Sequence, residues 1–148
     1  MTIAAILPLA PSIDQIGRII ATVAAPAFLL GAVAAFISVI MVRINRVIDR
    51  SHYIHGISEH DTRAYLRGDL PRLRHRASLL NRALFSAVMA AIMTSLIIII
   101  AFVSALFHFA HEYGAAILFV AALILFCAAL IDLARETRIA LHQNDLHG

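Results

Sequence analysis

Three long uncharged runs dominate the pattern of hydrophobic and polar positions along this chain. They cover residues 19–42, 83–107 and 113–131, and none of them contains Asp, Glu, Lys or Arg. The hydrocarbon core of a bilayer is about 30 Å thick, and a helix crosses it in roughly 20 residues. Lone strands would leave unpaired backbone groups in lipid, so each run is predicted to be a helix. The pattern therefore predicts an all-α bundle that crosses a membrane three times.

The polar segment between the first two runs, residues 43–82, keeps a helical character at both ends. No Gly or Pro interrupts residues 43–50, so the first helix is expected to continue beyond the membrane. Asp69 followed by Pro71 is typical of a helix start. Helices one and two are therefore predicted to extend into the cytoplasm as an antiparallel hairpin, which a tip at residues 51–69 closes.

Composition supports the membrane assignment. The chain is 61% hydrophobic and 14% charged, whereas an ordinary soluble domain has about 45–50% and 25%. These values exclude a disordered chain and argue against a free soluble domain. The length suits a single membrane domain over residues 1–148. The single Cys127 excludes an internal disulfide and a cysteine-based zinc site.

Arginine predicts the orientation of the chain. All twelve basic residues are Arg; nine lie between the first two runs and two follow the third, whereas Arg18 lies on the opposite side. The positive-inside rule therefore places the hairpin and the C-terminus in the cytoplasm and the N-terminus outside. Residues 1–12 are expected at the membrane surface. The Arg cluster at 72–82 is expected to attract anionic lipids, while the scarcity of stacking aromatics argues against nucleic-acid binding.

Small residues recur at helical spacing in each run, and such residues allow close contact between helices in lipid. A seam on the first helix is predicted at Ala24, Ala27, Gly31, Ala34, Ser38, Met41, Asn45 and Ile48. On the second helix it is predicted at Ala83, Ala87, Ala90, Thr94, Ile97, Ala101, Ser104 and His108. The third helix carries Ala115, Ala122, Ala129 and Glu136, beside Leu118, Leu125 and Asp132. Because the sequence is rich in Ala, part of this pattern could also arise by chance.

The first helix carries two further features. Ala27, Gly31 and Ala35 form two successive steps of small residues, a second face that could bind a partner chain. Pro26 removes a backbone donor inside the span and is expected to kink the helix. A kink of this kind is common in spanning helices, and the alternative is a hinge or a freed carbonyl that lines a cavity.

Polar residues converge where the membrane is predicted to end on the cytoplasmic side. Asp132 lies flush with the end of the third span, and Arg43, Arg46 and Arg82 are the nearest cations. A salt-bridged lock is expected there, with a proton or ion site as the alternative. Arg76 is expected opposite Asp49 on the hairpin. The full predicted cluster comprises Asn45, Arg46, Asp49, Arg50, Asn81, Arg82, Asp132, Arg135 and Glu136.

The sequence predicts no catalytic, cofactor or metal site, because it contains no phosphate-binding glycine loop, nucleophile elbow or metalloprotease motif. His108 and His111 share a helical face beside Glu112 and could hold a metal, although histidines at a helix end are usually interfacial. The other His candidates, His52, His55 and His60, are interpreted as solvated tip residues, with a pH or metal sensor as the alternative.

Several segments carry a resemblance to a known family. Residues 25–30 (APAFLL) followed by 42–50 (VRINRVIDR) resemble the opening signature of the family catalogued as domain of unknown function 2721. Residues 79–83 (LLNRA) are similar to its second signature, and 133–138 (LARETR) to its closing segment. The resemblance covers about residues 15–142.

This resemblance implies three spans and a bacterial inner-membrane location, and it carries no established activity. Ala25 stands where family members usually have Ser, so a role for that hydroxyl does not transfer. The residues themselves favour a non-enzymatic membrane protein, either an oligomerising scaffold or an accessory subunit of a larger membrane complex. The alternative is a homo-oligomeric ion channel lined by the first helix, with Thr22 and Ser38 in the lining and an Arg-rich cytoplasmic mouth.

Overall fold

The computed structural model describes residues 13–107 and 112–144, and these are almost entirely helical. Helix α1 covers Ile13–His55, and a short 3₁₀ helix, η3, covers Ala64–Asp69. Helix α2 covers Leu70–Phe107 and α3 covers Glu112–Asn144. The described residues contain no strand, so the all-α prediction is confirmed. Residues 1–12 and the pair His108 and His111, for which the sequence made predictions, lie outside the described part.

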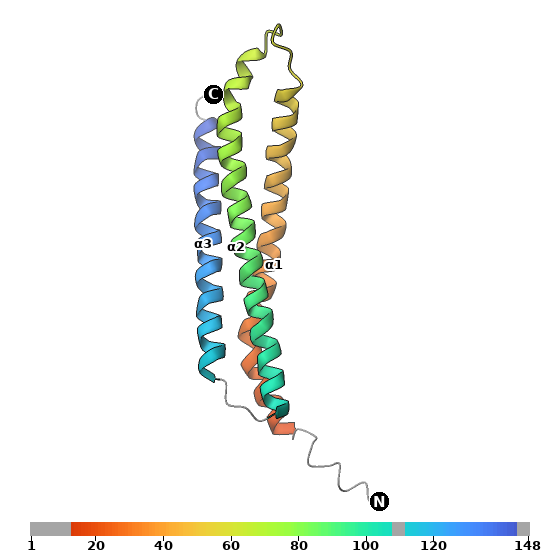
Figure 1. Cartoon of the computed structure of the whole chain (residues 1–148), viewed down its shortest axis with the longest axis vertical. Helices are drawn as coiled ribbons and strands as arrows, with labels where there is room; N and C mark the ends of the chain where they lie inside the picture. The colour runs from red at the N-terminus through yellow and green to blue at the C-terminus, as the bar shows by residue number, and fades with distance from the viewer. Residues whose placement is uncertain (1–12, 108–111, 145–148) are drawn as a thin grey trace, which may run out of the picture.

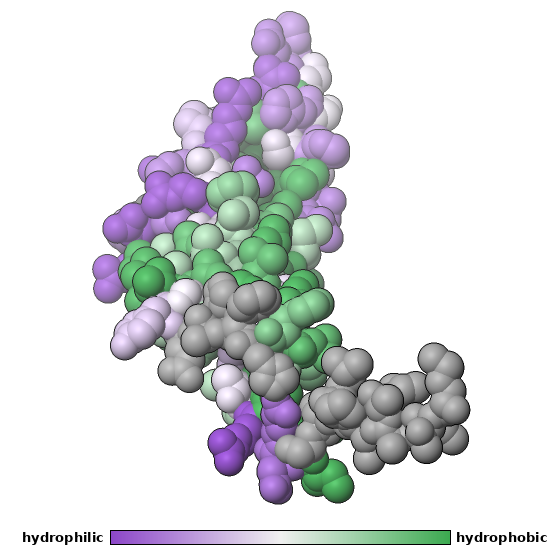
Figure 2. Space-filling view, turned by 60° about the horizontal axis from the view of Figure 1, so that its bottom comes forward, coloured by the Kyte–Doolittle hydropathy of each residue, from purple (hydrophilic) through white to green (hydrophobic). Residues whose placement is uncertain are grey.

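All three helices are long and apolar enough to cross a membrane, which makes the chain a multi-pass membrane protein. The 43 residues of α1 span about 64 Å, roughly twice the thickness of a hydrocarbon core. The predicted hairpin is present, because α1 continues about 18 Å beyond Arg43 and α2 begins about 18 Å before Arg82 (Figure 1). In Figure 2, hydrophilic residues cover the hairpin end and hydrophobic residues gather below it.

Helix α2 is the centre of the arrangement. It lies between α1 and α3 and packs against both along much of its length, whereas α1 and α3 touch each other at few points (Figure 1). One such point is an edge-to-face contact between Phe36 of α1 and Phe126 of α3, whose ring centroids are 5.4 Å apart. Helix α2 therefore connects the other two helices and positions them relative to each other.

In the core, bulky residues of α1 pack against small residues of α2. Helix α1 contributes Val33, Phe36 and Ile40, and these share one buried cluster with small residues of α2 such as Ala83 and Ala87. Small residues on one helix make room for bulky side chains of its neighbour, so the two helices can approach closely. The predicted seam of α2 is buried from Ala83 through Ala87, Ala90 and Thr94 to Ile97, and on α3 Ala122 and Ala129 are buried.

The predicted seam of the first helix is wrong. Its members from Ala24 to Ile48 are exposed, and the buried stripe of α1 runs instead along Pro26, Val33, Phe36, Ile40, Val47 and Ile54. The reason is that α2 already supplies the small side of the interface, so α1 presents its bulky side there. Pro26 is buried and α1 continues through it, although proline leaves the carbonyl of Thr22 without its usual helical donor.

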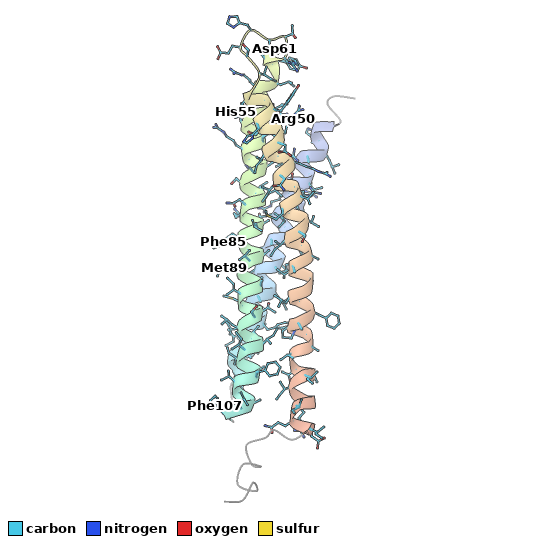
Figure 3. The ribbon with its side chains drawn as sticks, turned by 90° about the vertical axis from the view of Figure 1, so that its right-hand side faces the viewer. Arg50, His55, Asp61, Phe85, Met89 and Phe107 are labelled. Carbon is cyan, nitrogen blue, oxygen red and sulfur yellow. The ribbon has the colours of Figure 1, made fainter. Side chains whose placement is uncertain are left out.

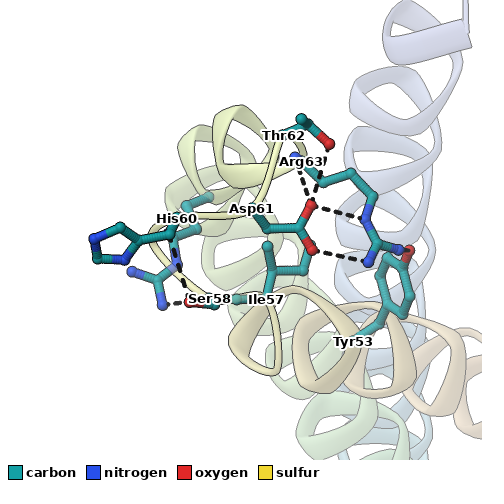
Figure 4. Close-up of polar contacts among 8 residues, drawn as sticks. Tyr53, Ile57, Ser58, His60, Asp61, Thr62 and Arg63 are labelled. Carbon is teal, nitrogen blue, oxygen red and sulfur yellow. Dashed lines mark hydrogen bonds and ion pairs between the residues drawn. The ribbon is translucent and has the colours of Figure 1, made fainter.

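The tip between α1 and α2 is held by local ion pairs. The guanidinium of Arg63 donates to both carboxylate oxygens of Asp61, at 3.3 and 2.9 Å, and to the hydroxyl of Tyr53 at 2.8 Å (Figure 4). Arg67 donates to the backbone oxygen of Ile57 and to Glu59. The side-chain and backbone hydrogen bonds from Arg63 lower the pKa of Asp61 to about 2. Asp61 is therefore ionised throughout the physiological pH range.

Candidate functional site

The uncharged runs of all three helices end at one level, and charged residues occupy that level. Arg43 follows the first run, Arg82 precedes the second, and Asp132 follows the third. Glu136 lies one helical turn beyond Asp132 on α3, about 6 Å farther from the apolar run. Two carboxylates and three guanidinium groups meet here, and we name Arg43, Arg76, Arg82, Asp132 and Glu136 the junction cluster.

Glu136 joins the three helices. Its side chain is fully buried, with 0% exposed. The Oε2 atom accepts a hydrogen bond from Nη1 of Arg43 on α1 at 2.7 Å. The Oε1 atom accepts from Nε and Nη2 of Arg76 on α2, at 2.9 and 2.8 Å. Arg43 also donates to the hydroxyl of Thr137 at 3.0 Å, and that hydroxyl donates to the carbonyl of Leu133.

Asp132 connects α3 to α2 one turn closer to the apolar run. Nε and Nη2 of Arg82 donate to its two carboxylate oxygens, at 2.9 and 3.1 Å. This two-point contact fixes the plane of the guanidinium as well as its distance. Arg135 lies 3.9 Å from the same carboxylate. The Asp132 side chain is only 3% exposed, whereas those of Arg82 and Arg135 are about two-thirds exposed.

Every buried charge in this region is neutralised by a neighbour. In the part of the chain that the structure describes, no buried side-chain nitrogen or oxygen lacks a hydrogen-bond partner. An unpaired carboxylate buried at this position would be costly, so the arginine partners stabilise the folded chain. The three arginines exceed the two carboxylates by one positive charge. The geometry is that of a structural lock, in which both carboxylates are fully engaged by arginine.

The structure brings part of the sequence-predicted cluster together. Arg82, Asp132 and Arg135 lie in contact, and Glu136 lies beside them. Five other members are exposed on the outer faces of α1 and α2: Asn45, Arg46, Asp49, Arg50 and Asn81. The guanidinium of Arg50 lies 6.0 Å from the ring centroid of Tyr53. The expected pairing of Asp49 with Arg76 is replaced by the contact of Arg76 with Glu136.

The sequence analysis did not predict the ion pair between Arg76 and Glu136, although the residue spacing indicates it. Arg76 and Leu80 continue the alternating spacing of the buried Ala83 and Ala87 seam on α2 toward the hairpin. Glu136 lies on the seam of α3, seven residues after Ala129. A charged residue on the buried seam of each helix predicts that these residues meet. Extending the seams past the membrane boundary would have identified the contact.

Comparison with known families adds to this picture. The family described as "Protein of unknown function (DUF2721)" matches residues 23–146, which is most of the chain. The chain belongs to this family. No curated protein and no solved structure matches it. The matched segment of this DUF2721 protein contains the entire junction cluster and the core residues of all three helices.

No group of three or more His, Cys, Asp or Glu side chains suited to a metal ion occurs among the residues that the structure describes. His52, His55 and His60 are exposed at the tip, where the Nδ1 atom of His55 lies 2.8 Å from the carbonyl oxygen of Ser51. Cys127 is exposed on the outer side of α3. The ion pairs found among the described residues lie at the junction cluster, with Arg135 beside it, and at the tip.

Proposed function

We propose that this DUF2721 protein is a non-enzymatic membrane scaffold or accessory subunit, which self-associates or joins a larger membrane complex. The observation that supports the proposal most directly is a contrast between two parts of the molecule. The carboxylates of the junction cluster are engaged within the chain by arginine. The outer face of α1 instead presents Ala27, Gly31 and Ala35, all three of which are exposed in the described part of the chain.

The exposed face of α1 has the properties of a helix-docking surface. A Cβ atom built on Gly31 would meet no atom within 4 Å, so the backbone is open to close approach. Phe28, which is 82% exposed, flanks this face and would pack against the side of a docked helix. Helices in lipid associate by van der Waals contact between closely spaced backbones, and small residues permit that spacing.

Replacing Gly31 with Leu is expected to convert an oligomer to the single chain. The added side chain would hold a second helix away from the α1 backbone, while the fold of the single chain has room for it. The measurement is the protein mass in detergent micelles by light scattering. Ala116→Leu, which introduces the same leucine side chain at an exposed position on α3, is the matched control and should leave the mass unchanged. If the wild-type protein is already a single chain in micelles, self-association is wrong. The accessory-subunit proposal would then stand alone, and co-purification of a native complex tests it.

A homo-oligomeric ion channel is the second candidate. Thr22 and Ser38 lie on the exposed side of α1, where an oligomer would place them at its interface or lining. Their hydroxyls donate to carbonyls of their own helix, at Arg18 and Ala34, so they offer only acceptor positions to an ion. Ion flux through liposomes that contain the purified oligomer separates the candidates, because the scaffold predicts no flux above that of empty liposomes.

The proposal includes a location in a bacterial inner membrane with the hairpin in the cytoplasm, and it predicts a labelling pattern. In a Cys127→Ala background, Ser58→Cys at the exposed tip should react with a membrane-impermeant maleimide only after spheroplasts are lysed. Gly17→Cys, which is exposed near the other end of α1, is the control and should react with intact spheroplasts. Labelling of the tip in intact spheroplasts would overturn the orientation.

A further inference from the structure

A groove on α2 lies at the level where the uncharged run begins. It has a volume of about 490 Å³ and is lined by Ser78, Asn81, Arg82, Leu84, Phe85 and Val88. These residues follow one side of the helix over about 15 Å. Figure 3 shows Phe85 on the side of α2 that faces away from α1, and this residue is exposed.

The groove changes chemical character along its length. Ser78, Asn81 and Arg82 form the end nearer the hairpin, and all three can donate hydrogen bonds. Phe85 and Val88 form the end inside the uncharged run, where they are 66% and 39% exposed. A phospholipid has the same polarity along the same direction, because its phosphate lies at the membrane boundary and its acyl chains run inward. The groove is therefore aligned with a lipid that stands in the leaflet on the hairpin side.

Only some of the hydrogen-bond donors of Arg82 are engaged within the chain. Its Nε and Nη2 atoms donate to Asp132, which accounts for two of the five N–H donors of a guanidinium group. No acceptor in the described residues contacts the other three, and the side chain is 66% exposed. Because Asp132 holds the guanidinium plane in place, the remaining donors are oriented before any ligand arrives. Preorganisation of this kind reduces the ordering cost of binding.

The charge around the groove favours an anion. Asp132 faces two guanidinium groups, those of Arg82 and Arg135, so this part of the boundary carries a formal positive charge. Arginine binds phosphate through charge-assisted hydrogen bonds, and a fixed guanidinium adds directional preference. A zwitterionic headgroup would satisfy the donors of Arg82 but would bring a cation next to the same positive surface.

We propose that this groove is a binding site for one anionic phospholipid. The phosphate accepts hydrogen bonds from the free donors of Arg82, with the amide of Asn81 and the hydroxyl of Ser78 as neighbouring donors. One acyl chain lies along Phe85 and Val88. The site does not depend on self-association, because all of its lining residues come from a single chain.

Native mass spectrometry of the full chain in neutral detergent tests the proposal. Phosphatidylglycerol and phosphatidylcholine with identical acyl chains serve as the two probes. The wild type should retain phosphatidylglycerol more strongly. The double variant Arg82→Gln/Asp132→Asn removes the oriented guanidinium without changing the net charge or leaving a buried carboxylate unpaired. It should lower phosphatidylglycerol retention about fivefold and leave phosphatidylcholine retention unchanged.

Two controls make the result specific. Arg72→Gln removes one exposed positive charge from the same helix about 15 Å farther from the apolar run, and it should have little effect. Phe85→Ala leaves the ion pair intact and should weaken retention of both lipids. Equal retention of the two lipids by the wild type would overturn the proposal, as would an equal loss in Arg72→Gln and the double variant. Displacement of phosphatidylglycerol by millimolar inorganic phosphate would also overturn it, because the site would then be one for a free anion.

Discussion

Replacing Glu136 with Ala is expected to lower the free energy of unfolding by about 3–5 kcal/mol, since it leaves two partly buried arginines without their carboxylate. Arg76 is 19% exposed and Arg43 34% exposed, so both guanidinium groups would lose their carboxylate while still partly shielded from water. The value should lie toward the lower end of the range, because Arg43 reaches solvent more easily. The measurement is reversible unfolding in mixed micelles, followed by loss of helical circular dichroism.

Two further variants separate the role of charge from that of shape at this position. Glu136→Gln keeps the size of the side chain and one acceptor oxygen but removes the charge. Its free energy of unfolding should therefore lie between those of the wild type and Glu136→Ala. Replacing Arg43, Arg76 and Glu136 together by Met, Met and Leu should restore most of the stability, because no unpaired charge is then buried. A fully stable Glu136→Ala variant would show that the junction cluster does not hold the helices together.

Replacing Ala87 with Leu is expected to destabilise the protein by about 1–3 kcal/mol, because the added carbons enter a buried interface between helices. Ala87 is 0% exposed on α2, in the cluster that also contains Phe36 and Ile40 of α1. A larger side chain there must push α1 or α3 away from α2. The same unfolding assay measures the effect, with Ala116→Leu on the exposed side of α3 as the matched control.

The expected pattern distinguishes a specifically packed bundle from three loosely associated helices. In a packed bundle Ala87→Leu is costly and Ala116→Leu is close to neutral. If both variants unfold at the same denaturant concentration as the wild type, the α2 seam does not set the distance between the helices. Because Ala87 and Glu136 lie on different helices and at different depths, a double variant should show nearly additive losses of stability.

The losses of stability expected for Glu136→Ala and Ala87→Leu correspond to two different structural roles. Apolar contact along the α2 seam brings the helices together within the membrane, where lipid gives no hydrophobic driving force between them. The junction cluster then sets their axial positions, since Glu136 can reach Arg43 and Arg76 together only when all three helices are in register. The outer face of α1 takes part in neither task, and the groove on α2 shares only Arg82 with the junction cluster.

Much of the fold could be predicted from the sequence, because lipid permits few alternatives. Uncharged runs of this length must form helices to satisfy their own backbone, so the positions of the three spans followed directly. The continuation of α1 beyond Arg43 was predictable from the lack of Gly and Pro in residues 43–50. The buried seams of α2 and α3 were visible because Ala and Thr recur there at regular spacing.

The tertiary structure alone decided which face of α1 is buried and which charges pair. Small residues on α1 and bulky residues on α1 both form continuous stripes, and the choice between them depends on the partner surface, where α2 already presents Ala83 and Ala87. Likewise, arginines outnumber carboxylates near the boundary, so spacing alone assigned Arg76 to Asp49. Only the rotation of each helix about its axis, which packing in the core determines, directs Arg76 to Glu136.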